Sequence, residues 1–219
     1  MEPARFDNIF FARGKRELFT RSKGDALFDE KIVVMDGVSC RSWDPKRSKL
    51  GAAIMKGASQ IGIREGSIVL YLGAAHGYTP SFVSDIIGEA GMVFALDFAP
   101  RVVKDLIHVC EQRQNMVPLL GDASNPRSYL DRLCLVDVVY QDIAQRLQTR
   151  IFLDNCRLFL KPDGYGLFAV KARSIDVARN PDAIFKEVAL ELAKELVIVD
   201  QRRLDPFEKD HIMFICKKR

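Results

Sequence analysis

The sequence predicts an α/β fold in which helices cover both faces of a mostly parallel sheet of seven strands. One observation is that apolar runs of strand length alternate with stretches of helical spacing from residue 68 onward. The other is that four successive runs end in a glycine or an acidic residue, at positions 20 to 25 residues apart: Gly73, Asp97, Asp122 and Asp142. Each interval holds a loop, a helix and the next strand. Parallel strands would place these residues at one edge of the sheet, where ligands bind.

The chain is expected to have two parts, a small N-terminal antiparallel β unit over residues 1–47 and a larger domain over residues 48–219. Short apolar pieces separated by glycines predict the β unit; they lie at residues 8–11, 18–20 and 31–35, with Gly14, Gly24 and Gly37. Residues 48–61 have helical spacing of apolar side chains, although Gly51 and Gly57 are poor helix formers.

Alternating strands and helices make up the larger domain. The predicted strands are residues 68–72, 92–96, 116–120, 135–140 and 167–170, and the predicted helices are 79–87, 100–113, 146–160 and 182–196. Thr79 and Pro80 suit a helix start, because threonine caps free amides and proline fits the first helical position. Residues 197–199 and 212–215 are predicted to close the sheet as an antiparallel pair.

Length and composition indicate a globular chain, with 219 residues of which 48% are hydrophobic. No apolar run approaches the roughly 18 residues of a membrane span, and the first residues lack the apolar segment of a signal peptide. We therefore expect a cytoplasmic protein without membrane contact. The five cysteines are scattered and never form a Cys-x-x-Cys pair, which argues against a disulfide framework and against a metal site.

The net charge of +4 permits binding to polyanions without requiring it. Basic residues gather at positions 41–49, 171–173 and 217–219, with Arg146, Arg150 and Arg157 between them. For an isolated run of this kind, a solvated face is the expected interpretation.

The turn after the first strand of the larger domain predicts a nucleoside cofactor. Gly73 and Gly77 permit a tight turn that brings backbone amides close to a ligand, and Asp97 stands where a carboxylate accepts both hydroxyls of a ribose. The spacing is not the Gly-x-Gly-x-x-Gly of dinucleotide sites, and the bulky His76 and Tyr78 would crowd a pyrophosphate. S-adenosylmethionine has no phosphate, so it suits this turn better.

Neighbouring strand ends supply candidates for the rest of the cofactor. Asp122 is placed to accept from an adenine amine, and Phe98 offers an apolar face to the ring. Asp142 and Gln145 are candidates for the ammonium of a methionine moiety. Each of these residues alone is more often a turn or cap residue, so the prediction depends on their recurrence at successive strand ends.

Longer strings carry a more specific signal than the glycine turn. They are RSWDPKRSKL at 41–50, YLGAA at 71–75, VSDII at 83–87, FAPR at 98–101, GDA at 121–123, DIAQ at 142–145, KARSIDV at 171–177 and PFEKDH at 206–211. Through them, almost the whole chain resembles the fibrillarin family of RNA 2′-O-methyltransferases, especially its short archaeal members. The resemblance implies a Rossmann-like class I methyltransferase fold and S-adenosylmethionine as cofactor.

The resemblance implies a cofactor site drawn from four strand ends: Gly73, Ala75, Tyr78, Thr79, Asp97, Phe98, Asp122, Ala123, Asp142, Ile143, Ala144 and Gln145. The chain departs from the family pattern at two places. His76 and Tyr78 replace small serine and threonine beside the methionine end of the cofactor, and Gln141 replaces an alanine. The bulky pair predicts a difference in cofactor affinity or in its pH dependence.

Methyl transfer to a ribose hydroxyl requires in-line approach to the sulfonium methyl and removal of a weakly acidic proton. The resemblance implies four catalytic residues: Lys49, Asp142, Lys171 and His211. In this interpretation Lys171 orients or deprotonates the hydroxyl, Asp142 positions it, and Lys49 adds positive potential. Taken alone, Lys49 is an ordinary surface lysine at a helix start, and His211 is a core histidine or one that only orients an RNA group.

The resemblance also implies partners. The particle would be a box C/D ribonucleoprotein, in which a guide RNA pairs with ribosomal or transfer RNA, a Nop-type scaffold protein docks this subunit, and a kink-turn-binding ribosomal-type protein completes the assembly. The sequence has no arginine–glycine tract and no RRM signature, so guidance is expected from elsewhere. Two alternatives stay open: a methyltransferase acting on a small molecule or protein, and a structural subunit with little catalysis.

Overall fold

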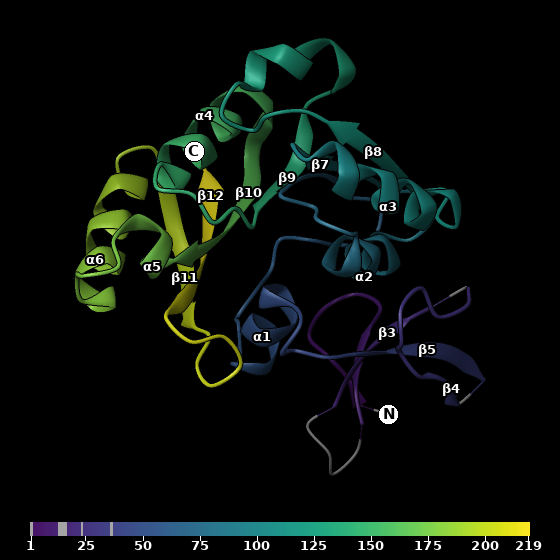
Figure 1. Ribbon diagram of the computed structural model, residues 1–219. Helices are drawn as coiled ribbons and strands as arrows, with labels where there is room; N and C mark the ends of the chain where they lie inside the picture. The colour runs from purple at the N-terminus through teal and green to yellow at the C-terminus, as the bar shows by residue number, and fades with distance from the viewer. Residues whose placement is uncertain (1, 13–16, 23, 36) are drawn as a thin grey trace.

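The computed structural model describes residues 2–12, 17–22, 24–35 and 37–219, which build one large and one small sheet (Figure 1). The large sheet has the order β11-β12-β10-β9-β6-β7-β8, with β6 (Ile68–Leu72), β7 (Met92–Asp97), β8 (Met116–Leu120), β9 (Val136–Gln141), β10 (Leu160–Lys171), β11 (Leu196–Arg203) and β12 (His211–Lys218). Strands β6 to β10 pair in parallel, and β12 runs antiparallel to both of its neighbours. This arrangement confirms the predicted sheet of seven strands and its closing antiparallel pair.

The small sheet is antiparallel and lies on the N-terminal side, as predicted. Its order is β1-β2-β3-β5-β4, with β1 (Glu2–Pro3), β2 (Ile9–Phe11), β3 (Leu18–Arg21), β4 (Ile32–Met35) and β5 (Val38–Trp43). Strand β5 was not among the predicted pieces, because serine and arginine interrupt its apolar residues. It nevertheless pairs with both β3 and β4 and so holds the small sheet together.

Helices cover both faces of the large sheet. They are α1 (Lys49–Met55), α2 (Tyr78–Ile87), α3 (Pro100–Glu111), α4 (Gln148–Phe159), α5 (Ala172–Ile175) and α6 (Pro181–Leu192), with a 3₁₀ helix η1 at Pro126–Arg132. Buried side chains of α1, α2 and α3 share one hydrophobic cluster with the small sheet. Those of α4 and α6 form a second cluster on the other face. The layered α/β prediction is therefore confirmed.

Several predicted boundaries were wrong. The helix expected over residues 48–61 ends at Met55, because Gly57 adopts a left-handed φ of 78° and its amide closes the helix on the carbonyl of Ile54. The strand expected over 167–170 begins at Leu160 and contains a register shift before Tyr165, so its proline–glycine segment is an irregularity inside a strand. Helix α2 is capped by Gly77, not by Thr79.

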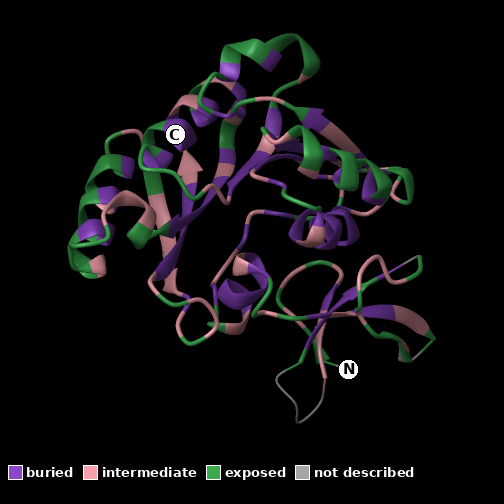
Figure 2. Ribbon diagram, in the orientation of Figure 1, coloured by how far each residue is buried: buried purple, intermediate pink, exposed green. Residues whose placement is uncertain are grey.

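Helix α2 is enclosed between the two sheets, and nine of its ten residues are buried (Figure 2). A buried charge cluster joins its outer face to the small sheet. Asp85 of α2 accepts hydrogen bonds from Thr20 Oγ1 at 2.7 Å and from Arg41 Nε at 3.1 Å, and it also pairs with Arg113. The Arg41 guanidinium lies 3.9 Å from the centre of the Phe82 ring. The prediction of a solvated face for residues 41–49 is therefore wrong at Arg41, which is fully buried.

Candidate active site

The turn between β6 and α2 depends on two glycines. Gly73 has a φ of 81°, and a Cβ there would collide with the carbonyl oxygen of Asp142 and lie 3.0 Å from both the carbonyl carbon of Asp142 and Cγ1 of Ile143. Ordinary contacts of that kind lie at 3.4–4 Å. Gly77 has a φ of 89°, and a Cβ there would crowd Leu106 of α3. The turn can therefore approach the end of β9 closely only because these positions lack side chains.

Asp97, at the end of β7, is fixed by backbone donors. Its Oδ2 accepts from the amide of Ala75 at 3.0 Å, and its Oδ1 accepts from the amide of Ala99 at 3.1 Å. Only 9% of the residue is exposed, whereas the neighbouring Phe98 is 67% exposed. The carboxylate thus keeps one orientation beside the turn, with spare lone pairs for a ribose, and Phe98 presents an open aromatic face.

At the end of β8, Asp122 is exposed and its Oδ1 accepts from the amide of Ser124 at 2.8 Å, while Ala123 is buried. Thr79 is also buried, and its Oγ1 donates to Ser48 Oγ at 3.1 Å, which links the start of α2 to the start of α1. Gln145 is exposed on the loop after β9.

The two bulky residues of the turn do not face the site as expected. The Tyr78 hydroxyl accepts from the amide of Asp44 at 3.3 Å, and its ring packs edge-on against Phe82 with a centroid distance of 5.1 Å. The side chain of Tyr78 therefore points into the contact with the small sheet, and only its backbone belongs to the turn. His76 is exposed, with Nε2 3.5 Å from Asp105 Oδ2 of α3. The Tyr78 side chain would therefore not crowd a ligand at the turn, and the expected difference in cofactor affinity or in its pH dependence stays a prediction.

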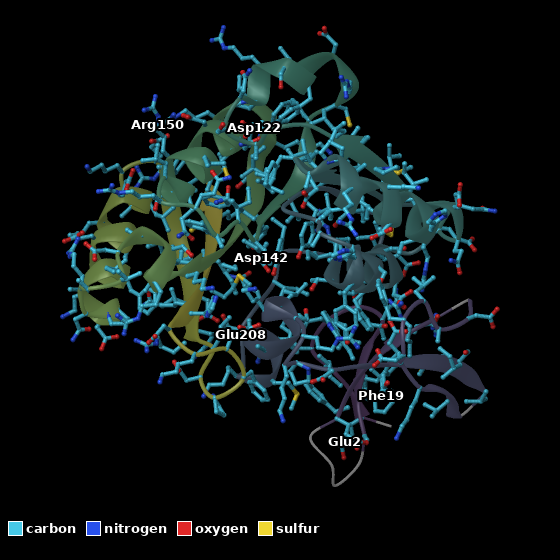
Figure 3. All side chains as sticks on the ribbon, viewed as in Figure 1. Glu2, Phe19, Asp122, Asp142, Arg150 and Glu208 are labelled. Atoms are coloured by element: carbon cyan, nitrogen blue, oxygen red, sulfur yellow. The ribbon has the colours of Figure 1, made fainter. Side chains whose placement is uncertain are left out.

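A cavity of about 140 Å³ lies beside the turn and brings together all four predicted catalytic residues. It is lined by Lys49, Asp142, Ile143, Ala144, Ala169, Lys171, Glu208 and His211. These side chains come from α1, from the loop after β9, from β10, and from the start of β12 and the loop that leads into it. Figure 3 shows Asp142 in the middle of the molecule, directly after β9, and Glu208 near α1 on the loop that leads into β12. Lys171 and His211 are register partners across the β10–β12 pair.

Lys49 is held between two carboxylates. Its Nζ lies 3.0 Å from Asp142 Oδ2 and 4.0 Å from Glu208 Oε1. Burial by itself would lower the pKa of Lys49, but the charge and hydrogen bond of Asp142 and the charge of Glu208 outweigh it and raise that pKa. Lys49 is therefore a fixed positive charge and no ordinary surface lysine. The Lys171 ammonium, in contrast, has no ion pair or hydrogen bond within the described part of the chain.

His211 is 6% exposed, and its Nδ1 lies 2.7 Å from the carbonyl oxygen of Lys209. Burial lowers the pKa of its imidazole, and the charge of Lys49 acts in the same direction. The hydrogen bond to Lys209 and the carboxylates of Glu208 and Asp142 oppose this effect without reversing it. The net effect is a pKa of His211 below its ordinary value, which favours the neutral ring.

Two residues of the site, Glu208 and Gln148, were not predicted from the sequence. Glu208 lies within the PFEKDH string, but only the loop geometry shows that it faces Lys49 and His211. Gln148 is fully buried at the start of α4, and its side-chain amide bonds both the carbonyl and the amide of Lys171, at 3.2 and 3.3 Å. Gln141, the departure from the family pattern, donates from Nε2 to the carbonyl of Gln148 at 2.7 Å. The two glutamines thus fix the backbone beneath Lys171.

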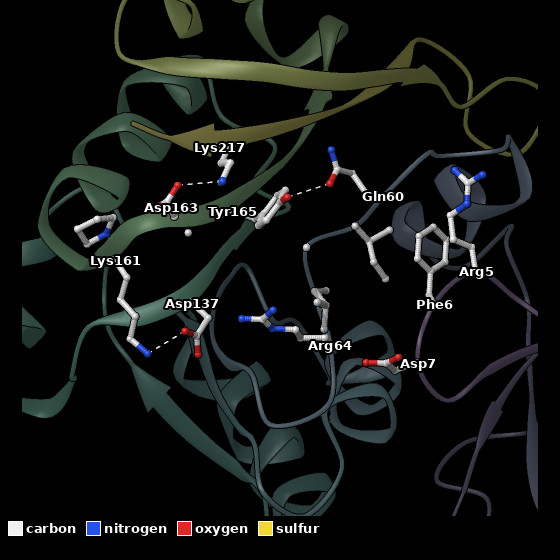
Figure 4. A pocket seen from close by; sticks show the side chains of 15 residues that line it. Arg5, Phe6, Asp7, Gln60, Arg64, Asp137, Lys161, Asp163, Tyr165 and Lys217 are labelled. Carbon is white, nitrogen blue, oxygen red and sulfur yellow. Dashed lines mark hydrogen bonds and ion pairs between the residues drawn. The ribbon is translucent and has the colours of Figure 1, made fainter.

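A larger cavity, of about 470 Å³, lies at the other end of β9 and β10, beside the first residues of these strands. None of the predicted site residues lines it (Figure 4). Its lysines pair with its own aspartates, Lys161 with Asp137 at 2.8 Å and Lys217 with Asp163 at 2.9 Å. Within the described residues, no group of three or more histidine, cysteine or acidic side chains is arranged to hold a metal ion. None of the helices in the described residues is long and apolar enough to cross a membrane.

Comparisons with known proteins show the family of the chain. The family model described as Fibrillarin matches residues 1–219. A fibrillarin-like rRNA/tRNA 2′-O-methyltransferase of Thermococcus onnurineus is 45% identical over 207 residues, which cover 94% of this chain and 92% of that protein.

Two solved structures are also similar. Aeropyrum pernix fibrillarin in complex with natively bound S-adenosyl-L-methionine has a TM-score of 0.90 and 39% identity, and the match covers 98% of this chain and 96% of that one. The chain in a fibrillarin/Nop5p complex has a TM-score of 0.91 and 37% identity, with coverage of 99% and 100%. The expected methyltransferase fold is confirmed, and the chain belongs to the fibrillarin family.

Proposed function

We propose that this chain transfers a methyl group from S-adenosylmethionine to the 2′-oxygen of a ribose in ribosomal RNA, and also in transfer RNA, as the catalytic subunit of a guided ribonucleoprotein. One observation carries the proposal. Asp142 belongs to both halves of the site, because its backbone packs against the Gly73 turn while its carboxylate binds Lys49 in the cavity. A cofactor bound at the turn would therefore lie next to the group of residues that receives the acceptor hydroxyl.

The residues at the strand ends fit S-adenosylmethionine, which supplies an electrophilic methyl group on a sulfonium. Asp97 would hold the ribose hydroxyls, because backbone amides fix its carboxylate beside the turn. The exposed ring of Phe98 and the carboxylate of Asp122 would contact the adenine. Asp142 and Gln145 would hold the ammonium of the methionine moiety. The similar protein of Aeropyrum pernix, which has this cofactor bound, supports the assignment.

The side chains of the cavity orient the acceptor hydroxyl and favour the loss of its proton. Lys171 orients the acceptor hydroxyl, because its ammonium lines the cavity without any other partner among the described residues. Lys49 keeps its charge and adds positive potential, which stabilises the negative charge that develops on the acceptor oxygen as it loses its proton. Asp142 fixes Lys49 at 3.0 Å and thereby positions the hydroxyl. Gln148 holds the backbone of Lys171 in place.

The proposal includes partners, because guidance must come from outside the chain. A similar protein is known in complex with Nop5p, which supports a Nop-type scaffold as the docking partner. A box C/D guide RNA would select the target by base pairing, and a kink-turn-binding protein would complete the particle. The net charge of +4 favours association with such RNA.

The test is incorporation of labelled methyl from S-adenosylmethionine into a guide-matched RNA by the reconstituted particle. Lys171→Ala and Asp142→Ala are compared with Lys217→Ala and Asp163→Ala, a lysine and an aspartate that pair beside the larger cavity. We expect methylation only at the guided ribose, lost in the first two variants and kept in the controls. Cofactor binding without guided methylation would instead indicate a small-molecule or protein acceptor, and absence of cofactor binding would indicate a structural subunit.

A further inference from the structure

Strand β10 extends past the end of its parallel neighbour β9. The last register pair between the two strands joins Gln141 to Phe168, whereas β10 continues to Lys171. On its other side β10 is still paired at this point, because His211 of β12 is the register partner of Lys171. On the side that β9 has left, the backbone of Lys171 needs other hydrogen-bond partners, since an unpaired strand edge leaves amides and carbonyls without them.

The side chain of Gln148 supplies both partners. Its Oε1 accepts from the amide of Lys171 at 3.3 Å, and its Nε2 donates to the carbonyl of Lys171 at 3.2 Å. A primary amide offers an acceptor and a donor side by side, as a neighbouring strand would. Gln148 is the first residue of α4 and is fully buried, so solvent does not reach its amide. It therefore takes the place of β9 beside Lys171.

Gln141, the last residue of β9, fixes the point from which Gln148 reaches Lys171. Its Nε2 donates to the backbone carbonyl of Gln148 at 2.7 Å. With the amide turned the other way, two oxygens would face each other, so this bond determines its orientation. The Oε1 of Gln141 is buried and has no hydrogen-bond partner among the described residues, which lowers stability. That cost suits a residue whose role is to place Gln148 rather than to stabilise the fold.

The loop between the two glutamines, residues 142–147, carries Asp142 and Gln145, which are proposed to hold the methionine end of the cofactor. The two glutamines bond each other across this loop, and the amide of Gln148 donates to the carbonyl of Gln145 at 3.3 Å. The side chain of the same Gln148 holds Lys171, which lines the acceptor cavity. One buried side chain therefore joins the cofactor loop to this lysine.

We propose that Gln141 and Gln148 are positioning residues that set the separation between the cofactor loop and Lys171, and through it the distance from the sulfonium methyl to the acceptor hydroxyl. This inference rests on the proposed function. Neither glutamine lines the cavity, so both act through Lys171. The effect is geometric, and it is the same whether Lys171 donates to the hydroxyl or takes its proton. A misplacement of about 1 Å at a reacting centre lowers the rate by about 100-fold.

The experiment compares Gln148→Leu and Gln141→Leu with the control Gln60→Leu. Leucine fills about the same volume as glutamine but makes no hydrogen bond. Gln60 is matched because its side chain is also bonded to β10, at the other end of the strand, where its Oε1 accepts from the Tyr165 hydroxyl at 2.9 Å.

The first measurement is amide hydrogen exchange at Lys171 in the full chain, corrected for the change in free energy of unfolding that urea reports. Exchange should be faster by about tenfold or more in both glutamine variants and unchanged in the control. Gln141→Leu is the sharper variant, because Gln141 reaches Lys171 only through Gln148.

The second measurement is single-turnover guided methylation by the whole particle. The rate should fall by about 10- to 100-fold in both glutamine variants. The calorimetric affinity for S-adenosylmethionine and the RNA concentration at half-maximal rate should stay within about threefold of wild type. Glutamines with a purely structural role would instead lower the free energy of unfolding and leave the rate unchanged.

Methylation rates within about threefold of wild type in both glutamine variants would overturn the inference, and so would a rate loss matched by an equal loss of cofactor affinity. Exchange at Lys171 that is no faster in Gln141→Leu than in the control would overturn it as well, and this variant decides the matter if Gln148→Leu does not fold. Absence of guided methylation by the wild-type particle would count against the proposed function itself, whereas the exchange result counts only for or against the glutamine pair, which keeps the two failures distinguishable.

Discussion

The close approach of Gly73 to the end of β9 gives a prediction that can be separated from ordinary glycine effects. Gly73→Ala would place a Cβ at 3.0 Å or less from three atoms, the carbonyl oxygen and carbon of Asp142 and Cγ1 of Ile143, at least 0.4 Å inside the ordinary contact range of 3.4–4 Å. Gly66 is the matched control, because it precedes the same strand at its other end and has a φ of 79°, close to the 81° of Gly73. A Cβ at Gly66 meets nothing within 4 Å.

Both substitutions force alanine into the left-handed region, which costs about 1–2 kcal/mol. Gly73→Ala adds the cost of overpacking, about 1–3 kcal/mol, so its free energy of unfolding should fall by about 2–5 kcal/mol in total. A shift of Asp142 by a fraction of an ångström should also reduce methylation by about 10- to 100-fold, whereas Gly66→Ala should methylate like wild type.

Urea unfolding measures the loss in free energy of unfolding. Calorimetric titration with S-adenosylmethionine measures cofactor binding, and guided methylation measures the loss of activity. Equal loss of stability in the two variants, together with unchanged methylation by Gly73→Ala, would refute the argument that the glycine is needed for proximity to Asp142.

Three further predictions concern the joint between the sheets, the turn and the pH dependence of stability. Asp85→Ala leaves the buried Arg41 guanidinium without its main partner, so urea unfolding should show a loss of about 3–5 kcal/mol, and a loss below about 1 kcal/mol would contradict the buried pair. Tyr78→Phe removes only the acceptor for the Asp44 amide, so calorimetry should find an affinity for S-adenosylmethionine within about threefold of wild type, and a tenfold change would show that the hydroxyl faces the ligand after all. Because burial lowers the pKa of His211 in the folded state, the unfolded chain binds the extra proton first, and stability should fall as the pH drops below about 6.5. This fall should be shallower in His211→Gln, and identical slopes would contradict a buried neutral imidazole.

The sequence predicted the strand ends well, because apolar runs and the residues that end them are local features. Gly73, Asp97 and Asp142 lie where the alternation of strands and helices placed them, and Asp142 does reach Lys49. The burial of Arg41 could not be predicted from local features, because it depends on the ion pair with Asp85, which is 44 positions away in the sequence. The direction of Tyr78 was missed for a similar reason, since a sequence gives the position of a side chain in a turn but not the neighbours that attract it.

Glu208 shows a different kind of failure. Its string was recognised as part of the family pattern, yet charged residues in loops usually face solvent, and no spacing rule points this one inward. Its place in the cavity depends on the closure of the loop onto Leu204, which combines short-range backbone bonds with a distant hydrophobic contact. Gln148 was missed because a polar residue at a helix start is ordinarily a surface residue. Here it is hydrogen-bonded to Gln141 at the end of β9 and to Lys171 at the end of β10.

The enclosure of α2 between the two sheets bears on how the molecule unfolds. The outer face of this helix is covered by the small sheet through the stacked rings of Trp43 and Phe82, 4.7 Å apart, and through the charges around Asp85. Removing the first strands would expose that face and leave Asp85 facing Arg113 in water. We therefore expect one cooperative unfolding transition for the whole chain, in which the N-terminal strands and the cofactor turn are lost together.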